Sequence, residues 1–364
     1  MASAPRSTHV RTCSPDIAVR ILFISQSPDY PENPAGGRIN ADRLCIRLRD
    51  RGVQFALLSL GEIVSAAPYV LDYPAYMRPD TPGSIREVIA QFQPELAMLQ
   101  CCRCFDVADT CLSINLPTLA YLHDTEFNWL FHQGSGPRSI DLAHPLLAYI
   151  ANSSYTARRL RDVLGIDASV LPPFIEPERY RTETTRQSVV FVNPVPEKGV
   201  ARAIRLAESR PDIEFEFVES WKLHSPYVDN LRAMLRLLPN VKLSAPVSDM
   251  REVYGRAKVL LAPSRWAEAW GRVVSEAQVN GIPALVSDRG GLPEALGPGG
   301  LAVDEDAGDE SWSNALARIW DDPSEYQRLA DAAFAHAARP DFQPDALLDR
   351  FIAIASSHAG THAP

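Results

Sequence analysis

The chain has 364 residues, of which 46% are hydrophobic, and a formal net charge of −9. This length suits two globular domains, each with its own core, and the acidic balance argues against a nucleic-acid partner. No stretch approaches the 18 or so consecutive apolar residues that a membrane span needs. The N-terminal stretch lacks an apolar segment, so we interpret residues 1–16 as a disordered tail, with a transit peptide as the alternative.

The six cysteines give little support for a metal site. Cys101 and Cys104 have the spacing C-x2-C, but no second pair and no suitably spaced histidine follows. We expect free thiols in a reducing compartment and predict neither a bound metal ion nor a cofactor.

The first half of the chain alternates between short apolar runs and helical segments. Strands are predicted at 19–25, 55–60, 96–100, 118–122 and 146–152, and helices at 38–51, 84–92 and 155–164. The polar, proline-rich and tyrosine-rich segment 62–82 is predicted to be an irregular excursion. Strands that alternate with helices are typical of a doubly wound α/β sheet.

Two positions in this half lie where such sheets bind ligands, at the carboxyl ends of strands. Gly36 and Gly37 precede the first helix, where glycine allows close approach of a ligand to the backbone. His123 directly follows a predicted strand, and Asp124 comes next. The alternatives are that the two glycines only form a plain turn and that His123 has only a structural role. The first helix also carries five arginines. They form either a solvent-exposed face of the helix or a surface that contacts an anionic partner.

The second half repeats the pattern of the first. Strands are predicted at 188–193, 214–218, 241–243, 259–262 and 282–287, and helices at 201–209, 248–255, 272–280, 311–320, 323–338 and 344–357. A further helix is predicted to start at Glu294. A polar segment, 181–187, separates the two halves and reads as a linker. The sequence therefore predicts two α/β units in tandem.

Two carboxylates frame the helix at 272–280. Glu268 precedes it and Glu276 lies within it, eight positions later, which would be about 80° apart on a continuous helix. Between them lies a helix N-terminus, whose free N–H groups and positive dipole end suit a phosphate. A ligand with hydroxyls on both sides of a diphosphate, such as a nucleotide-sugar, fits this arrangement. The alternative is an ordinary strand–helix unit with solvated glutamates.

Several segments resemble the GT4 family of retaining glycosyltransferases, which have the GT-B fold. They are EAWGRVVSEA at 268–277, LAPSRW at 261–266, NGIPALVSDRGGLPEA at 280–295, YLHDTEF at 121–127 and IANSSYTARRL at 150–160. The resemblance implies two Rossmann-like domains that face each other across a cleft. The acceptor domain would be 17–175 and the donor domain 182–342, and 343–364 would hold a helix that packs back on the first domain, then a tail.

The family also implies an activity, namely transfer of a sugar from a nucleotide-diphosphate-sugar to a hydroxyl acceptor, with retention and without a metal ion. Carried over by resemblance, the catalytic residues would be His123, Lys198, Glu268 and Arg272. The donor would contact Gly36, Gly37, Asn193, Trp221, Val247, Ala269, Trp270, Gly271 and Glu276, with Asp124 as a further candidate.

One loop departs from the family pattern. Relatives have V-G-R-L-x-x-E-K-G after the first strand of the donor domain, and both the arginine and the lysine hold the diphosphate. Aligning Lys198 and Gly199 with that motif puts Asn193 at the arginine's place. Asparagine carries no charge, so we expect Lys198 and Arg272 to share the diphosphate.

Two alternatives to a transferase stay open at this point: a GT-B nucleotide-sugar epimerase or hydrolase, and a non-catalytic nucleotide-sugar-binding protein. A nicotinamide dehydrogenase is weaker, because no G-x-G-x-x-G follows the first strand. We expect a cytoplasmic protein, with peripheral contact at the inner membrane left open. The sequence alone does not identify the sugar, the base or the acceptor.

Overall fold

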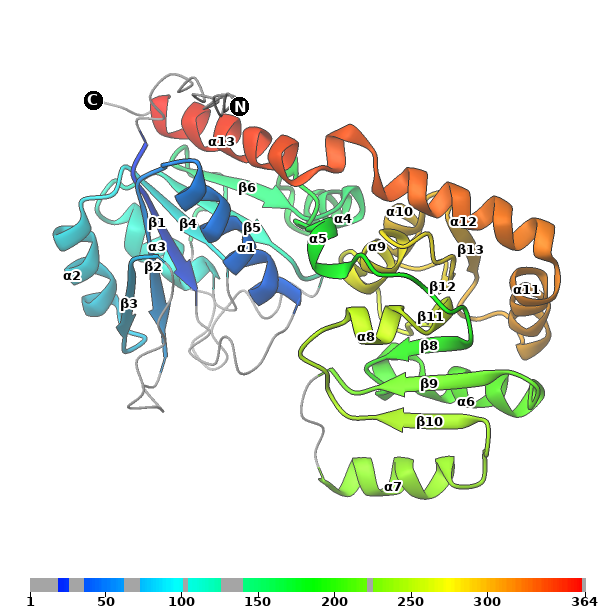
Figure 1. Cartoon of the computed structure of the whole chain (residues 1–364). Coiled ribbons are helices and arrows are strands. Elements are labelled where there is room, and N and C mark those ends of the chain that lie inside the picture. Colours follow the sequence, from blue (N-terminus) through cyan, green and yellow to red (C-terminus); the bar gives the residue numbers. More distant parts are fainter. Residues whose placement is uncertain are drawn as a thin grey trace, which may run out of the picture.

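The computed structural model describes residues 19–25, 36–61, 73–100, 104–125, 140–220 and 225–361. They form two sheets with helices on their faces, one sheet from each half of the chain (Figure 1). Every strand pairing in the described ranges is parallel. The predicted fold class, two doubly wound α/β units, is confirmed.

The first sheet has seven strands in the order β3-β2-β1-β4-β5-β6-β7. They are β1 (Ile21–Ser25), β2 (Phe55–Leu60), β3 (Ala75–Arg78), β4 (Leu96–Leu99), β5 (Thr118–Leu122), β6 (Leu147–Ala151) and β7 (Ser169–Val170). The helices are α1 (Gly36–Asp50), α2 (Pro82–Phe92), α3 (Cys104–Leu112) and α4 (Ser154–Leu164). All residues of β4 and β5 are buried, which explains their continuous apolar runs.

This half differs from the sequence prediction in several features, one of which is the unpredicted two-residue strand β7. The segment predicted to be irregular contains β3, which extends the sheet by pairing with β2. Helix α3 was not predicted, since its valine, threonine, aspartate and cysteines are weak helix formers. Helix α1 begins at Gly36, so the two glycines lie in its first turn and not in a preceding loop.

The described cysteines are buried thiols. Cys45, Cys104 and Cys111 lie in helices against the first sheet, and burial raises the pKa of Cys111 to about 12. Within the described ranges, no group of three metal-binding side chains occurs. Cys101 lies outside these ranges.

The second sheet has six strands in the order β10-β9-β8-β11-β12-β13. They are β8 (Ser188–Val192), β9 (Glu214–Val218), β10 (Val241–Ser244), β11 (Ala257–Ala262), β12 (Ala284–Ser287) and β13 (Gly300–Val303). The helices are α6 (Val200–Ser209), α7 (Ser225–Leu235), α8 (Arg251–Tyr254), α9 (Arg272–Gln278), α10 (Leu292–Leu296), α11 (Asp309–Asp321) and α12 (Pro323–Ala337). Of these elements, α7 and β13 were not predicted.

The last helix, α13 (Pro344–Gly360), follows α12 in the chain but packs on the first sheet (Figure 1). Leu347, Leu348 and Phe351 are fully buried in the core that β1 and α1 form. The chain therefore crosses between the two halves twice, once after β7 through the short helix α5 (Pro177–Tyr180) and once before α13. No helix of the described residues is long and apolar enough to span a membrane.

Candidate active site

A cavity of about 940 Å³ lies between the two sheets. Residues that follow strands of both sheets line it: His123 after β5, Asn193 after β8, Glu219 after β9 and Ser264 after β11. The cavity is thus at the carboxyl ends of both sheets, where open α/β sheets bind their ligands.

The structure brings most of the predicted site residues together in this cavity. Asp124 is exposed and is not part of the lining, and its Oδ1 accepts the backbone N–H of Thr125 at 2.7 Å. Trp221 lies outside the described residues. The other predicted residues all line the cavity, namely Gly36, Gly37, His123, Asn193, Lys198, Val247, Glu268, Ala269, Trp270, Gly271, Arg272 and Glu276.

Lys198 and Glu268 form an ion pair at the cavity wall. The Lys198 Nζ lies 2.5 Å from Glu268 Oε1, and Ser264 Oγ donates to the same oxygen at 2.6 Å. The ammonium also lies 4.8 Å from the centre of the Trp266 ring. Burial raises the pKa of Glu268, but Lys198 and the hydrogen bonds outweigh it, so this pKa lies below its usual range. Glu268 is therefore a carboxylate at neutral pH.

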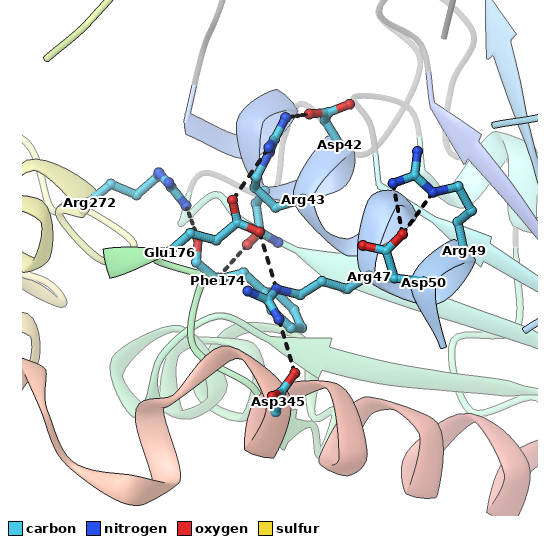
Figure 2. A network of polar contacts seen from close by, with 10 residues as sticks. Asp42, Arg43, Arg47, Arg49, Asp50, Phe174, Glu176, Arg272 and Asp345 are labelled. Carbon is cyan, nitrogen blue, oxygen red and sulfur yellow. Dashed lines mark hydrogen bonds and ion pairs between the residues drawn. The ribbon is translucent and has the colours of Figure 1, made fainter. Parts of the chain in front are cut away.

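Arg272 is buried and already has several partners. Its guanidinium donates to the Phe174 carbonyl at 3.1 Å, as Figure 2 shows, and to the Tyr180 hydroxyl at 3.3 Å. Its Nε lies 3.3 Å from Glu276 Oε1. A Cβ at Gly36 would lie 3.1 Å from Arg272 Cδ, so the glycine leaves room for this side chain. Arg272 thus joins α9 to the first crossing between the halves.

Glu276 faces the cavity from α9 and is buried. The Tyr254 hydroxyl donates to its Oε2 at 2.9 Å, and Arg272 lies on its other oxygen. Glu268 and Glu276 have separate partners, as their sequence spacing suggested. Gly271, just before α9, has φ 102°, and a Cβ there would be 2.5 Å from the Leu292 side chain. The turn between the two carboxylates therefore requires glycine.

His123 lies on the opposite wall, on the first sheet. Its ring packs against Tyr121, with 4.1 Å between ring centres, and its buried Nε2 has no hydrogen-bond partner among the described residues. Burial and the nearby Arg272 lower the pKa of His123 to about 3. The imidazole is therefore neutral at pH 7 and can hydrogen-bond a ligand without contributing charge.

Asn193 has an unusual backbone and an unused side chain. Its φ is 67°, in the left-handed region that glycine and asparagine tolerate best. Its backbone N–H donates to the Val218 carbonyl at 2.7 Å, which continues the ladder between β8 and β9. Its side-chain Nδ2 and Oδ1 are both buried and find no partner within the described part of the chain.

Sequence reasoning missed several polar residues at or near the site. Gln100 directly follows β4; its Nε2 donates to the Gly37 carbonyl, and its Oε1 is buried without a partner in the described ranges. Glu219 and Trp266 line the cavity. The position of Gln100 and Glu219 just after buried strands was the available signal.

Two hydrogen-bonded contacts tie the walls of the cavity together. Thr125 Oγ1, from the first half, donates to the Ala267 carbonyl at 2.8 Å. Ser154, at the start of α4, donates to the Glu294 carboxylate through its backbone N–H at 2.8 Å and its Oγ at 3.0 Å. The two halves are therefore in direct contact beside the cavity.

Comparison with known proteins finds a family model that matches the second half of the chain. Residues 175–336 match the family model of glycosyl transferases group 1. A GDP-mannose-dependent monoacylated alpha-(1-6)-phosphatidylinositol monomannoside mannosyltransferase of Corynebacterium glutamicum is 27% identical over 60% of this chain and 64% of its own length. A D-inositol 3-phosphate glycosyltransferase of the same species is 37% identical over 25% of this chain and 22% of its own length. The chain thus spans less than two thirds of these relatives.

Solved structures match over nearly the whole chain. Anabaena Alr3699/HepE, crystallised with UDP and glucose, has a TM-score of 0.78 at 19% identity, covering 93% of this chain and 100% of that protein. Sucrose-phosphate synthase from Thermosynechococcus elongatus has a TM-score of 0.76 at 15% identity, covering 94% of this chain and 100% of that protein. At these identities the likeness shows the fold alone.

Fold and sequence agree on the class of protein. The chain has the GT-B fold of glycosyltransferases. Its residues 175–336 match the model of glycosyl transferases group 1, which confirms the resemblance stated from the motifs for that part of the chain.

Proposed function

We propose that the protein is a retaining glycosyltransferase that moves a sugar from a nucleotide-diphosphate-sugar to a hydroxyl acceptor. The observation that carries this proposal is the cavity, in which Lys198, Glu268, Glu276 and His123 line one space between the two sheets. The glycosyltransferase relatives, and the Anabaena structure with UDP-glucose, support this class of donor.

In this proposal, positive charge stabilises the leaving nucleoside diphosphate. Preorganised charge aimed at a developing charge is a strong catalytic device in a shielded site. Lys198 would contact the phosphate and share its ammonium with Glu268. Arg272 already donates to Phe174 and Tyr180, so we propose that it acts through its charge and not by direct contact. With these groups supplying positive charge, the proposed transfer uses no metal ion.

The remaining roles follow from position in the cavity. Glu268 would hold sugar hydroxyls, Glu276 the ribose, and neutral His123 would hydrogen-bond the sugar near the reacting carbon. The acceptor oxygen would attack the anomeric carbon from the face that the diphosphate leaves, and the leaving phosphate would take the acceptor's proton. One C–O bond breaks as another forms on the same face, so the configuration is retained.

The experiment is a transfer assay with UDP-, GDP-, ADP- and dTDP-sugars and two acceptor probes, an alkyl glycoside and D-inositol 3-phosphate. The second probe is chosen because several relatives are glycosyltransferases named for it. The proposal predicts a product with the donor's anomeric configuration, detected by NMR, and its loss in Glu268→Gln. Nucleotide release that is equally fast with and without acceptor would favour a hydrolase, and binding without turnover would favour a non-catalytic protein.

We also propose a cytoplasmic enzyme that takes its acceptor on the side of the first sheet. If the acceptor is linked to a lipid, we propose in addition that the enzyme contacts the membrane surface peripherally. Vesicle co-sedimentation with anionic and neutral lipids tests that part separately.

A further inference from the structure

We propose that Asn193 and Glu219 form a corner of the cavity that binds a hydroxyl group of the donor and not its diphosphate. This inference rests on the proposed function and specifies it further. Asn193 follows β8 and Glu219 follows β9, and these strands pair in parallel with Val192 opposite Val218. The two residues are therefore neighbours at the carboxyl edge of the second sheet, and both line the cavity.

The chemistry of the Asn193 amide matches a hydroxyl group. Both its donor, Nδ2, and its acceptor, Oδ1, are buried and unpaired in the part of the chain that the structure describes. A hydroxyl can accept from the first and donate to the second at the same time. A phosphate oxygen can only accept, so it would leave Oδ1 unpaired and facing a negative charge.

Glu219 makes the same corner unfavourable for phosphate. Its side chain is 10% exposed, and its Oε1 lies 3.8 Å from the guanidinium of the more exposed Arg232. A buried carboxylate beside Asn193 repels an anion but accepts hydrogen bonds from hydroxyls. The Lys198 ammonium instead forms an ion pair with Glu268, away from this corner. We therefore propose that the diphosphate binds near Lys198, in a different part of the cavity.

The backbone of Asn193 decides which substitutions can test the proposal. At φ 67°, most side chains would strain the backbone, whereas glycine and aspartate are tolerated. Asn193→Gly removes the amide, and Asn193→Asp adds a negative charge of similar shape. Asn115 is an exposed asparagine with φ 58°, so Asn115→Gly and Asn115→Asp are matched controls.

The test is calorimetric titration of these variants with UDP, GDP, ADP and dTDP and with the corresponding nucleotide-sugars. We expect Asn193→Asp to bind the nucleoside diphosphate within about threefold of the wild type, because phosphate does not contact the corner. We expect Asn193→Gly to bind the nucleotide-sugar roughly tenfold more weakly, since two hydrogen bonds are lost. The Asn115 variants should match the wild type.

Two results would overturn the inference. In the first, Asn193→Asp weakens nucleoside diphosphate binding by about tenfold or more, with a loss that added salt reduces, which would place phosphate at the corner. In the second, Asn193→Gly binds every ligand as the wild type does. A wild-type chain that binds none of these ligands would overturn the proposed function and this inference with it, and that outcome is distinct from the other two.

Discussion

At the scale of single residues, the ion pair between Lys198 and Glu268 makes a stability prediction. Lys198→Met leaves the Glu268 carboxylate in a shielded site without its ammonium partner, although Ser264 Oγ still donates to it. An inadequately paired charged group of this kind costs about 1–3 kcal/mol, so we expect the free energy of unfolding to fall by that amount in urea titrations at pH 7. The pKa of Glu268 should rise at the same time.

The double variant Lys198→Met/Glu268→Gln is the control for this prediction. Removing the charge of Glu268 as well should restore part of the lost stability, because no carboxylate is then left without its ammonium. Losses that simply add in the double variant would mean that the two side chains do not stabilise each other.

His123 makes a prediction about pH. Its pKa in the folded chain is about 3, below the ordinary value of 6.5, so the unfolded chain binds the additional proton between these values. The free energy of unfolding should therefore fall as the pH drops from about 6.5 towards 3, by at most about 1.4 kcal/mol per pH unit from this group. His123→Asn should show a shallower fall in urea titrations between pH 6.5 and 4.

His336 provides the comparison for this pH effect. Burial lowers its pKa to about 4, and it lies on α12, so its contribution persists in His123→Asn. The variant should thus keep part of the acid sensitivity of the wild type. Identical pH profiles of the two proteins would contradict a His123 imidazole that stays neutral in the folded chain.

At the scale of elements, the contact between α4 and α10 holds the two halves together beside the cavity. Glu294, near the start of α10, accepts both hydrogen bonds from Ser154. Glu294→Ala removes them, and we expect a more open molecule with a larger radius of gyration in X-ray scattering. Donor binding should weaken roughly threefold or more, because fewer molecules are in the closed, binding-competent form.

A glutamate away from the cavity is the matched control for this change. Glu310 is exposed in the first turn of α11, and Glu310→Ala should leave both scattering and donor binding unchanged. A scattering profile of Glu294→Ala that superimposes on the wild type would contradict the role of this contact in closure.

Elements with strong local signals were predictable from sequence. The bounds of β2, β5 and β9 agree with the prediction, because each is a short apolar or alternating run between clear breaks. The edge strands β3 and β13 were missed, since each has only four residues, is partly exposed and has no more than three apolar residues in a row. Helix α4 also has a clear start signal, because the Ser153 side chain accepts the Thr156 N–H as its N-cap.

The candidate site was predictable in part, for a related reason. Glu268, Glu276 and His123 lie next to buried strands or a helix start, so their places at the carboxyl ends of the strands in their two sheets followed from the pattern. The hydrogen-bond partners of Arg272 could not be predicted from the sequence pattern. Phe174 and Tyr180 lie about a hundred positions earlier in the chain, and only the folded structure shows that they contact the guanidinium.

At the scale of the whole molecule, polar contacts connect the two halves where the chain crosses between them. Glu176, in the first crossing, lies 3.4 Å from Arg43 and 3.2 Å from Arg47, and Arg47 also lies 3.1 Å from Asp345 of α13 (Figure 2). Two of the arginines of α1 therefore bind the crossings. The sequence interpretation of this helix as a wholly solvated face is wrong for these two, because their partners are distant in sequence.

In the proposed function, the same layout would let one cavity serve both a donor and an acceptor. The second sheet contributes Lys198, Glu268 and Glu276 from one side, and the first contributes His123 from the other. Movement about the two crossings would change the distance between these walls, and the proposed transfer would need such a motion for donor entry and product release.

The most direct test of the account is calorimetric titration of the wild type, Lys198→Met and Glu276→Gln with UDP, GDP, ADP and dTDP. Glu214→Gln, at an exposed site on β9, is the control. The account predicts that at least one nucleotide binds the wild type and the control equally, and binds both cavity variants about tenfold or more weakly. Binding that neither cavity variant changes, or no binding at all, would contradict a donor site between the two sheets.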